Sequence, residues 1–154
     1  MKKPLKNTIN EMSIQYSITA KRNNTIKNTK ITSSIDAYNY AKNFYNDDIN
    51  IYESSFIILL DRAKNTKGYV KISQGGTAGT VVDVKIICYY VITALADSII
   101  MIHNHPSGNR LYSQNDIDIT IKIKEALKYL DVSLIDHIII THNSYNSMAD
   151  EGIL

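Results

Sequence analysis

Apolar residues along this chain follow two patterns, short runs and helically spaced positions. Largely apolar runs occur at Phe56–Leu60, Ser98–Ile102 and Val132–Ile140, and each predicts a buried strand. Apolar residues three and four positions apart instead predict amphipathic helices within residues 83–96 and 113–130. Because strands and helices interleave, the pattern predicts an α/β domain built around a sheet.

The remaining predicted elements are one further helix and three further strands. They are a helix capped by Ser33 and Ser34 and running through Tyr45, a hairpin strand at Tyr69–Ser73, a short strand at Tyr145–Met148 and an edge strand at Met12–Ile18. Residues 1–33 are polar and basic. We therefore predict a basic, partly flexible N-terminal arm over residues 1–33 and one domain over residues 34–154.

Composition narrows the class of protein. The chain has 154 residues, of which 44% are hydrophobic and 21% charged, as in an ordinary soluble domain. Its single cysteine, Cys88, excludes an intrachain disulfide and fits a reducing compartment. No apolar run approaches the roughly 20 residues that a membrane span needs. We expect a cytoplasmic protein that does not enter a membrane.

Positive charge gathers early in the chain, although the net charge is only +2. Seven basic residues precede the first acid-rich segment, namely Lys2, Lys3, Lys6, Lys21, Arg22, Lys27 and Lys30. Such a skew could steer a polyanion such as nucleic acid, or it could simply keep the arm solvated. We consider the solvated arm the better interpretation.

The densest group of reactive side chains follows the run at 98–102. His103 and His105 stand two positions apart at the strand end, so their side chains leave it on the same side. Ser113 then opens a helical pattern, and Asp116 falls in its first turn, facing back toward the strand. Two neutral imidazoles and one carboxylate leave a fourth tetrahedral position open, which is the layout of catalytic zinc. The spacing predicts one Zn²⁺ per chain.

Two further residues are candidates for catalysis. Glu53 lies just before the strand at 56–60, where its carboxylate could take a proton from water and return it to a leaving amine. Ser113 could donate a hydrogen bond to a developing oxyanion. Each also has a simpler interpretation, Glu53 as a solvated carboxylate and Ser113 as a helix cap with Asp116 in a capping box. We expect that Asp116 cannot readily cap the helix and ligate a metal at once.

Similar metal sites fit the sequence less well. Consecutive His-Asn-His is not the dispersed arrangement of an HNH nuclease, and a zinc deaminase needs a P-C-x-x-C partner that one cysteine cannot supply. Two histidines and a carboxylate also describe the iron(II) facial triad, but the upstream glutamate and the serine favour hydrolysis. We interpret His137 as a hydrogen-bonded structural residue and His142 as an exposed loop residue.

Together these five residues resemble the JAMM (MPN-plus) metalloprotease motif. The order is Glu53, His103-x-His105, seven residues, Ser113, two residues and Asp116. The resemblance implies that the histidines and the aspartate bind zinc, that the glutamate acts on the water and that the serine assists the oxyanion.

The surrounding segments are similar to the JAB domain of the RadC family. They are His103–Gly108, Asp136–Ile139 and Ser147–Gly152, and the likeness covers residues 36–154. This resemblance implies a single JAB/MPN-type α/β domain, with a mixed central sheet flanked by helices in a deaminase-like layering.

The chain departs from the usual RadC pattern around the expected substrate groove. Tyr112 stands where a proline is usual, and Val84-Lys85 replaces a Pro-Arg-like pair. Ser55 or, with a one-residue shift, Phe56 stands where a bulky aromatic is usual. Full-length RadC proteins also carry an upstream helix-hairpin-helix segment associated with DNA. At 154 residues we expect this segment to be missing here, so a role in DNA repair transfers poorly.

The sequence thus predicts a zinc-dependent metallohydrolase of the metallopeptidase or isopeptidase type, which cleaves an amide bond in an unknown peptide or isopeptide. The alternative is a non-catalytic RadC-like interaction module, DNA-associated or borne on a mobile element. The basic arm and the changed groove residues support that alternative.

Overall fold

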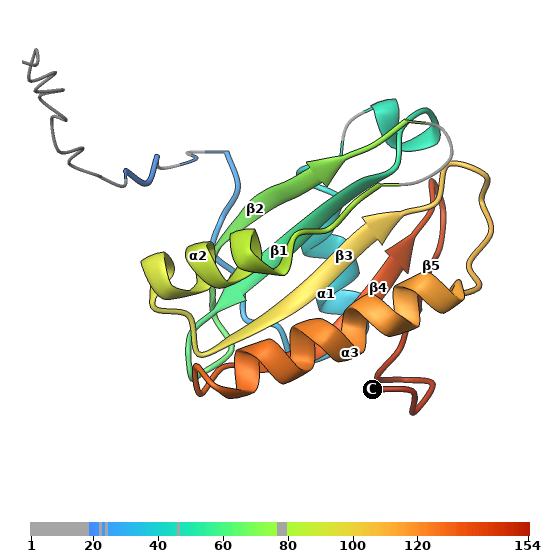
Figure 1. The fold of residues 1–154 in the computed structure, drawn as a ribbon. Helices are drawn as coiled ribbons and strands as arrows, with labels where there is room; N and C mark the ends of the chain where they lie inside the picture. Colours follow the sequence, from blue (N-terminus) through green and yellow to red (C-terminus); the bar gives the residue numbers. More distant parts are fainter. Residues whose placement is uncertain (1–18, 22, 24, 46, 77–79) are drawn as a thin grey trace, which may run out of the picture.

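The computed structural model describes residues 19–154 except 22, 24, 46 and 77–79 (Figure 1). Within this part of the chain, five strands and three α-helices form one α/β unit. In chain order the elements are α1 (Ser34–Ala41), the 3₁₀ turn η1 (Asp47–Asn50), β1 (Ser54–Leu60), β2 (Thr66–Gln74), α2 (Val84–Ala94), β3 (Ser98–Asn104), α3 (Gln114–Lys128), β4 (Ser133–Ile140) and β5 (Tyr145–Ser147). The edge strand predicted at Met12–Ile18 lies outside the described residues, and the division at residue 33 stays a prediction.

The five strands form one mixed sheet in the order β2-β1-β3-β4-β5. Strand β1 is antiparallel to β2 and to β3, β3 and β4 are parallel, and β5 returns antiparallel to β4. A parallel pair needs a long crossover, and α3 supplies it between β3 and β4. The predicted α/β fold with a mixed, helix-flanked sheet is confirmed.

Helices cover both faces of the sheet, with α1 on one face and α2 and α3 on the other (Figure 1). Alternate residues of β1 therefore enter two separate cores. Phe56 and Ile58 pack in the core beneath α1, whereas Ile57 and Leu59 pack in the core beneath α2 and α3. Every residue of β1 and β3 is buried, which explains why these strands have continuous apolar runs.

Helix α1 ends earlier than predicted, whereas α2 lies within its predicted range. Helix α1 stops at Ala41 instead of reaching Tyr45, because the Asn43 side chain donates to the carbonyl of Tyr40 over 2.9 Å and satisfies the helix end. Helix α2 stops at Ala94, where a left-handed Leu95 (φ 48°) turns the chain toward β3. Local hydrogen bonds decide both ends, and apolar spacing does not report them.

Candidate metal centre

Two histidines at the end of β3 meet an aspartate from the first turn of α3. Nε2 of His103 lies 2.9 Å from Nε2 of His105 and 3.3 Å from Oδ1 of Asp116. Nε2 of His105 lies 3.8 Å from Oδ2 of Asp116. Two nitrogens held about 2.0–2.1 Å from a tetrahedral ion are about 3.3 Å apart, so this donor set suits one such ion with little movement. The structure thus brings together the three side chains that the sequence predicts as metal ligands.

The hydrogen bond of His105 determines which of its nitrogens is free. Its Nδ1 lies 2.7 Å from the carbonyl oxygen of Asn109. A carbonyl can only accept, so Nδ1 carries the proton and Nε2 keeps a lone pair directed at His103 and Asp116. The loop after β3 thus holds His105 in the tautomer that a metal requires.

A chain of hydrogen bonds beneath the site assigns the tautomer of His103 in the same way. The Thr120 hydroxyl donates to the carbonyl of Asp116 (2.5 Å) and must therefore accept from Nδ1–H of His137 (2.5 Å). Nε2 of neutral His137 then accepts from Nδ1–H of His103 over 2.7 Å. His103 is left with a lone pair on Nε2, the atom that faces His105 and Asp116.

Burial keeps both inner histidines neutral. His103 is only 2% exposed and His137 is fully buried. Loss of hydration lowers the pKa of His103 to about 4 and that of His137 well below its ordinary value. Neutral imidazole is the form that ligates metals, so the fold maintains it at physiological pH. His137 is hydrogen-bonded as predicted, and His142 is exposed as predicted.

Asp116 divides its two oxygens between two tasks. Oδ2 accepts from the backbone N–H of Ser113 (2.7 Å) and from its hydroxyl (2.6 Å), which completes a capping box at the start of α3. Oδ1 is directed at His103. Capping leaves Oδ1 outside the capping box, and the expectation that Asp116 cannot readily cap and ligate at once stays a prediction. The Ser113 hydroxyl donates to Oδ2 of Asp116, and its action on an oxyanion stays a prediction.

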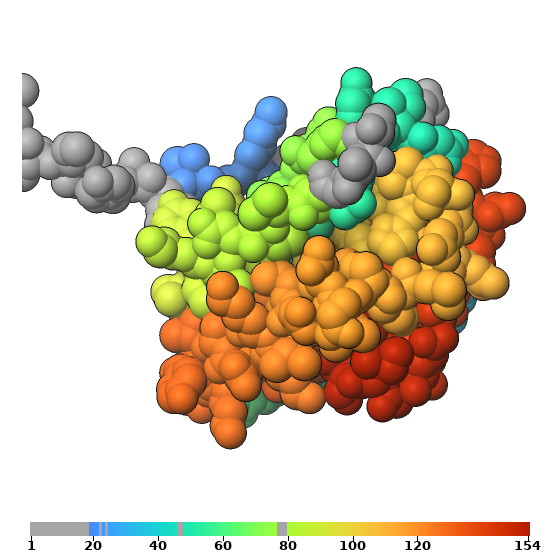
Figure 2. Space-filling view, turned by 45° about the vertical axis from the view of Figure 1, so that its right-hand side comes forward, coloured from blue at the N-terminus to red at the C-terminus, as the bar shows by residue number. Residues whose placement is uncertain are grey.

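Glu53 lines two cavities that border the three candidate ligands. A cavity of about 250 Å³ is lined by Glu53, His103 and Asp116, and another of about 300 Å³ by Glu53, His105 and Ser113. Burial is the main cause that raises the pKa of Glu53 above its ordinary value. Figure 2 shows the surface of the loop after β3 (gold) between α3 (orange) and the segment before β1 (teal).

Asn104 holds the Glu53 segment in place, a role that the sequence did not reveal. Its Oδ1 accepts from the backbone N–H of Ser54 over 2.7 Å, and its Nδ2 donates to the carbonyls of Ile49 (2.6 Å) and Tyr52 (2.8 Å). These bonds flank Glu53 on both sides. One feature of the sequence could have indicated this role. Asn104 stands between His103 and His105 on a strand, so alternation directs its side chain to the face opposite the histidines.

A second hydrogen-bond network, around Asp136, joins two segments that resemble RadC proteins, Asp136–Ile139 and Ser147–Gly152. Asp136 Oδ1 accepts from the backbone N–H of His137 (2.8 Å) and of Ala149 (3.0 Å), and Oδ2 accepts from the Ser147 hydroxyl (2.6 Å). Burial raises the pKa of Asp136. This carboxylate ties the C-terminal turn to β4 just behind His137.

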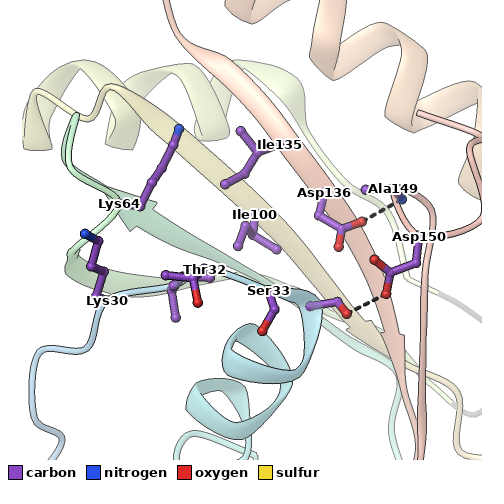
Figure 3. A pocket seen from close by; sticks show the side chains of 11 residues that line it. Lys30, Thr32, Ser33, Lys64, Ile100, Ile135, Asp136, Ala149 and Asp150 are labelled. Atoms are coloured by element: carbon purple, nitrogen blue, oxygen red, sulfur yellow. Dashed lines mark hydrogen bonds between the residues drawn. The ribbon is translucent and has the colours of Figure 1, made fainter.

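The cleft next to this network carries both signs of charge. Lys30 and Lys64 lie at one end, and Asp136 and Asp150 lie at the other (Figure 3). The hydroxyl of Ser34 donates to Asp150, and Asp136 is bonded as described. These acids are engaged in structural hydrogen bonds, and the cleft is separated from the histidines by the sheet.

The fold and the site together define an α/β domain with a His₂Asp candidate metal centre. A family model described as the RadC-like JAB domain matches residues 31–153. The chain belongs to this family. No α-helix among the described residues is both long and apolar enough to cross a membrane.

Relatives named UPF0758 protein support this membership. One from Flavobacterium johnsoniae is 39% identical over 128 residues, which are 83% of this chain and 55% of the relative. One from Coprothermobacter proteolyticus is 35% identical over 135 residues, or 86% of this chain and 57% of the relative. One from Porphyromonas gingivalis is 36% identical over 125 residues, or 80% and 54%. The chain spans about half the length of the curated relatives it matches.

Proposed function

We propose that this protein is a zinc-dependent hydrolase that cleaves an amide bond in a peptide or isopeptide. The observation that carries the proposal is the convergence of His103, His105 and Asp116, with both imidazoles held as Nε2 lone-pair donors. Glu53 lines both cavities that these residues border. Nitrogen and carboxylate donors in this number suit zinc with a position left for substrate.

The reaction divides between the ion and the protein. Zn²⁺ in this site would supply a Lewis acid that makes water a better nucleophile near neutral pH. The Glu53 carboxylate takes the proton from the attacking water and transfers it to the nitrogen of the leaving amine. Its raised pKa suits both steps, because a base that must later act as an acid works best when its pKa lies closer to the working pH.

Metal content is the first test of the proposal. The protein, purified with zinc present, is expected to carry about one zinc per chain by elemental analysis, and His103→Ala and Asp116→Ala are each expected to lose it. His142→Ala is the matched control, because His142 is an exposed loop histidine outside the candidate centre. Stoichiometric zinc in both ligand variants would defeat the assignment.

Catalysis needs a separate test that leaves metal binding intact. Glu53→Gln is expected to retain zinc but to lose hydrolysis of quenched peptide and isopeptide libraries by about 10²- to 10⁴-fold, because the amide cannot accept the proton. Cleavage that survives both this substitution and metal chelation would come from elsewhere and would contradict the proposal.

The interaction-module alternative and the cytoplasmic location stay predictions. Most of the basic arm lies in residues 1–18, outside the described part of the chain. DNA binding that weakens with salt, disappears with residues 1–30 and ignores chelation would favour the alternative.

A further inference from the structure

The cavity of about 250 Å³ beside His103 contains a buried hydroxyl without a partner. Ser55 is 1% exposed, and its Oγ is the one buried side-chain polar atom among the described residues that makes no hydrogen bond. A buried polar group left unpaired costs free energy, so it calls for an explanation. Because Ser55 lines the cavity, a molecule inside it can supply the missing bond.

The fold places this hydroxyl next to the candidate metal centre. Ser55 is the register partner of His103 across the antiparallel pair of β1 and β3. Directly opposed residues have Cβ atoms about 5 Å apart and point to the same face. The neighbour Phe56 points to the other face, into the core beneath α1. Of the two positions in this segment, only Ser55 therefore faces the cavity.

The other lining side chains limit what fits. Val82, Met101 and Ile119 form the apolar part of the wall. Neutral polar side chains (Thr80, Asn115) and two carboxylates (Glu53, Asp116) also line the cavity. An anionic group would meet these carboxylates, and a purely apolar group would leave the Ser55 hydroxyl unpaired. A short, neutral side chain with one hydrogen-bonding atom satisfies both conditions.

We propose that this cavity is a substrate subsite that accepts a neutral, hydrogen-bonding side chain, of which threonine is the type, and that the Ser55 hydroxyl reads it. The inference rests on the proposed hydrolase function, because the cavity borders the place where the amide bond would lie. It names one property of the substrate, namely a hydroxyl-bearing residue adjacent to the scissile bond.

Threonine and valine differ mainly in one hydroxyl, so they test the subsite directly. N-acetyl-threonine methylamide and N-acetyl-valine methylamide are titrated into the zinc-supplied full chain, and binding is followed by NMR at the amides of Ser55, Met101 and Ile119. One hydrogen bond predicts an affinity about five-fold higher for the threonine amide. Ser55→Ala is expected to abolish this preference.

Ser54→Ala is the matched control, because strand alternation directs that side chain to the opposite face. It is expected to keep the preference for threonine. Ser55→Ala loses no hydrogen bond, so its melting temperature should not fall, and this shows that the variant is folded. Equal binding of the two amides by the unsubstituted protein, or a preference that survives in Ser55→Ala, overturns the subsite.

This titration separates the two proposals. A threonine preference without any hydrolysis of peptide libraries would retain the subsite and reject the enzyme. Hydrolysis that proceeds equally beside threonine and valine would retain the enzyme and reject the subsite.

Discussion

At the residue scale, the site depends on which atom of each side chain faces the centre. Asp116 uses one oxygen for the helix cap and directs the other at His103. Thr120 donates to a carbonyl and thereby becomes the acceptor for His137. These assignments follow from donor and acceptor chemistry, and they show that residues behind the candidate ligands fix which ring nitrogen faces the centre.

Thr120→Val tests this second layer. Loss of the hydroxyl removes the acceptor for Nδ1–H of His137, which frees that ring to change tautomer and to stop holding His103. Zinc affinity, measured by competition with a chromophoric chelator, is expected to fall about 10- to 100-fold. Thr93→Val is the matched control, since Thr93 makes the same bond to a carbonyl four residues earlier but lies on the exposed side of α2. Unchanged affinity in Thr120→Val would contradict the assigned chain.

At the element scale, the two faces of strand β3 have different roles at its end. His103 leaves toward α3, whereas Asn104, one residue later, leaves toward the α1 side and fastens the segment around Glu53. This strand end therefore presents a candidate ligand on one face and, on the other, an amide that holds the segment around Glu53.

Asn104→Ala removes this anchor. Three backbone groups lose their partner, so the free energy of unfolding is expected to drop by about 2–4 kcal/mol in urea titrations. Zinc content should remain, because none of the candidate ligands is bonded to this side chain, while hydrolysis should fall with the displacement of Glu53. Exposed Asn39→Ala on α1 should change stability by no more than about 0.5 kcal/mol. An unaltered hydrolysis rate in Asn104→Ala would show that the anchor is not needed.

At the scale of the whole molecule, burying two neutral histidines makes stability depend on pH. The unfolded chain protonates them near their ordinary pKa of 6.5, whereas folded His103 does so only near pH 4 and His137 well below 6.5. Between those values the unfolded state binds more protons, so a falling pH favours unfolding.

Chelator-treated protein is therefore expected to lose stability as the pH falls from about 6.5 toward 4. Each fully shifted histidine contributes about 1.4 kcal/mol per pH unit in this window. Urea unfolding at a series of pH values measures the slope. Added zinc should raise the free energy of unfolding at pH 7 by mass action. A flat profile between pH 7 and 5 would show that these rings are not buried as neutral bases.

Much of the architecture and of the candidate site could be predicted from local patterns. The continuous runs at β1 and β3 identify strands buried on both faces, and the two-residue spacing of His103 and His105 places both rings on one side. The position of Asp116 in the first turn of α3 could also be predicted, because Ser113 is a typical N-cap residue and Asp116 follows three positions later. These features depend on residues that are neighbours in sequence.

Tertiary structure decided what depends on distant residues. The pairing of Ser55 with His103, the bonds from Asn104 to the segment around Glu53 and the shifted histidine pKa values all arise where separate segments pack. The spacing of apolar residues predicts on which face of an element a side chain lies, but it does not predict which distant residue that side chain contacts. The sequence by itself therefore determined the elements and the donor set, and the packed sheet determined tautomers, burial and the unpaired hydroxyl, because hydration is lost only when the chain folds.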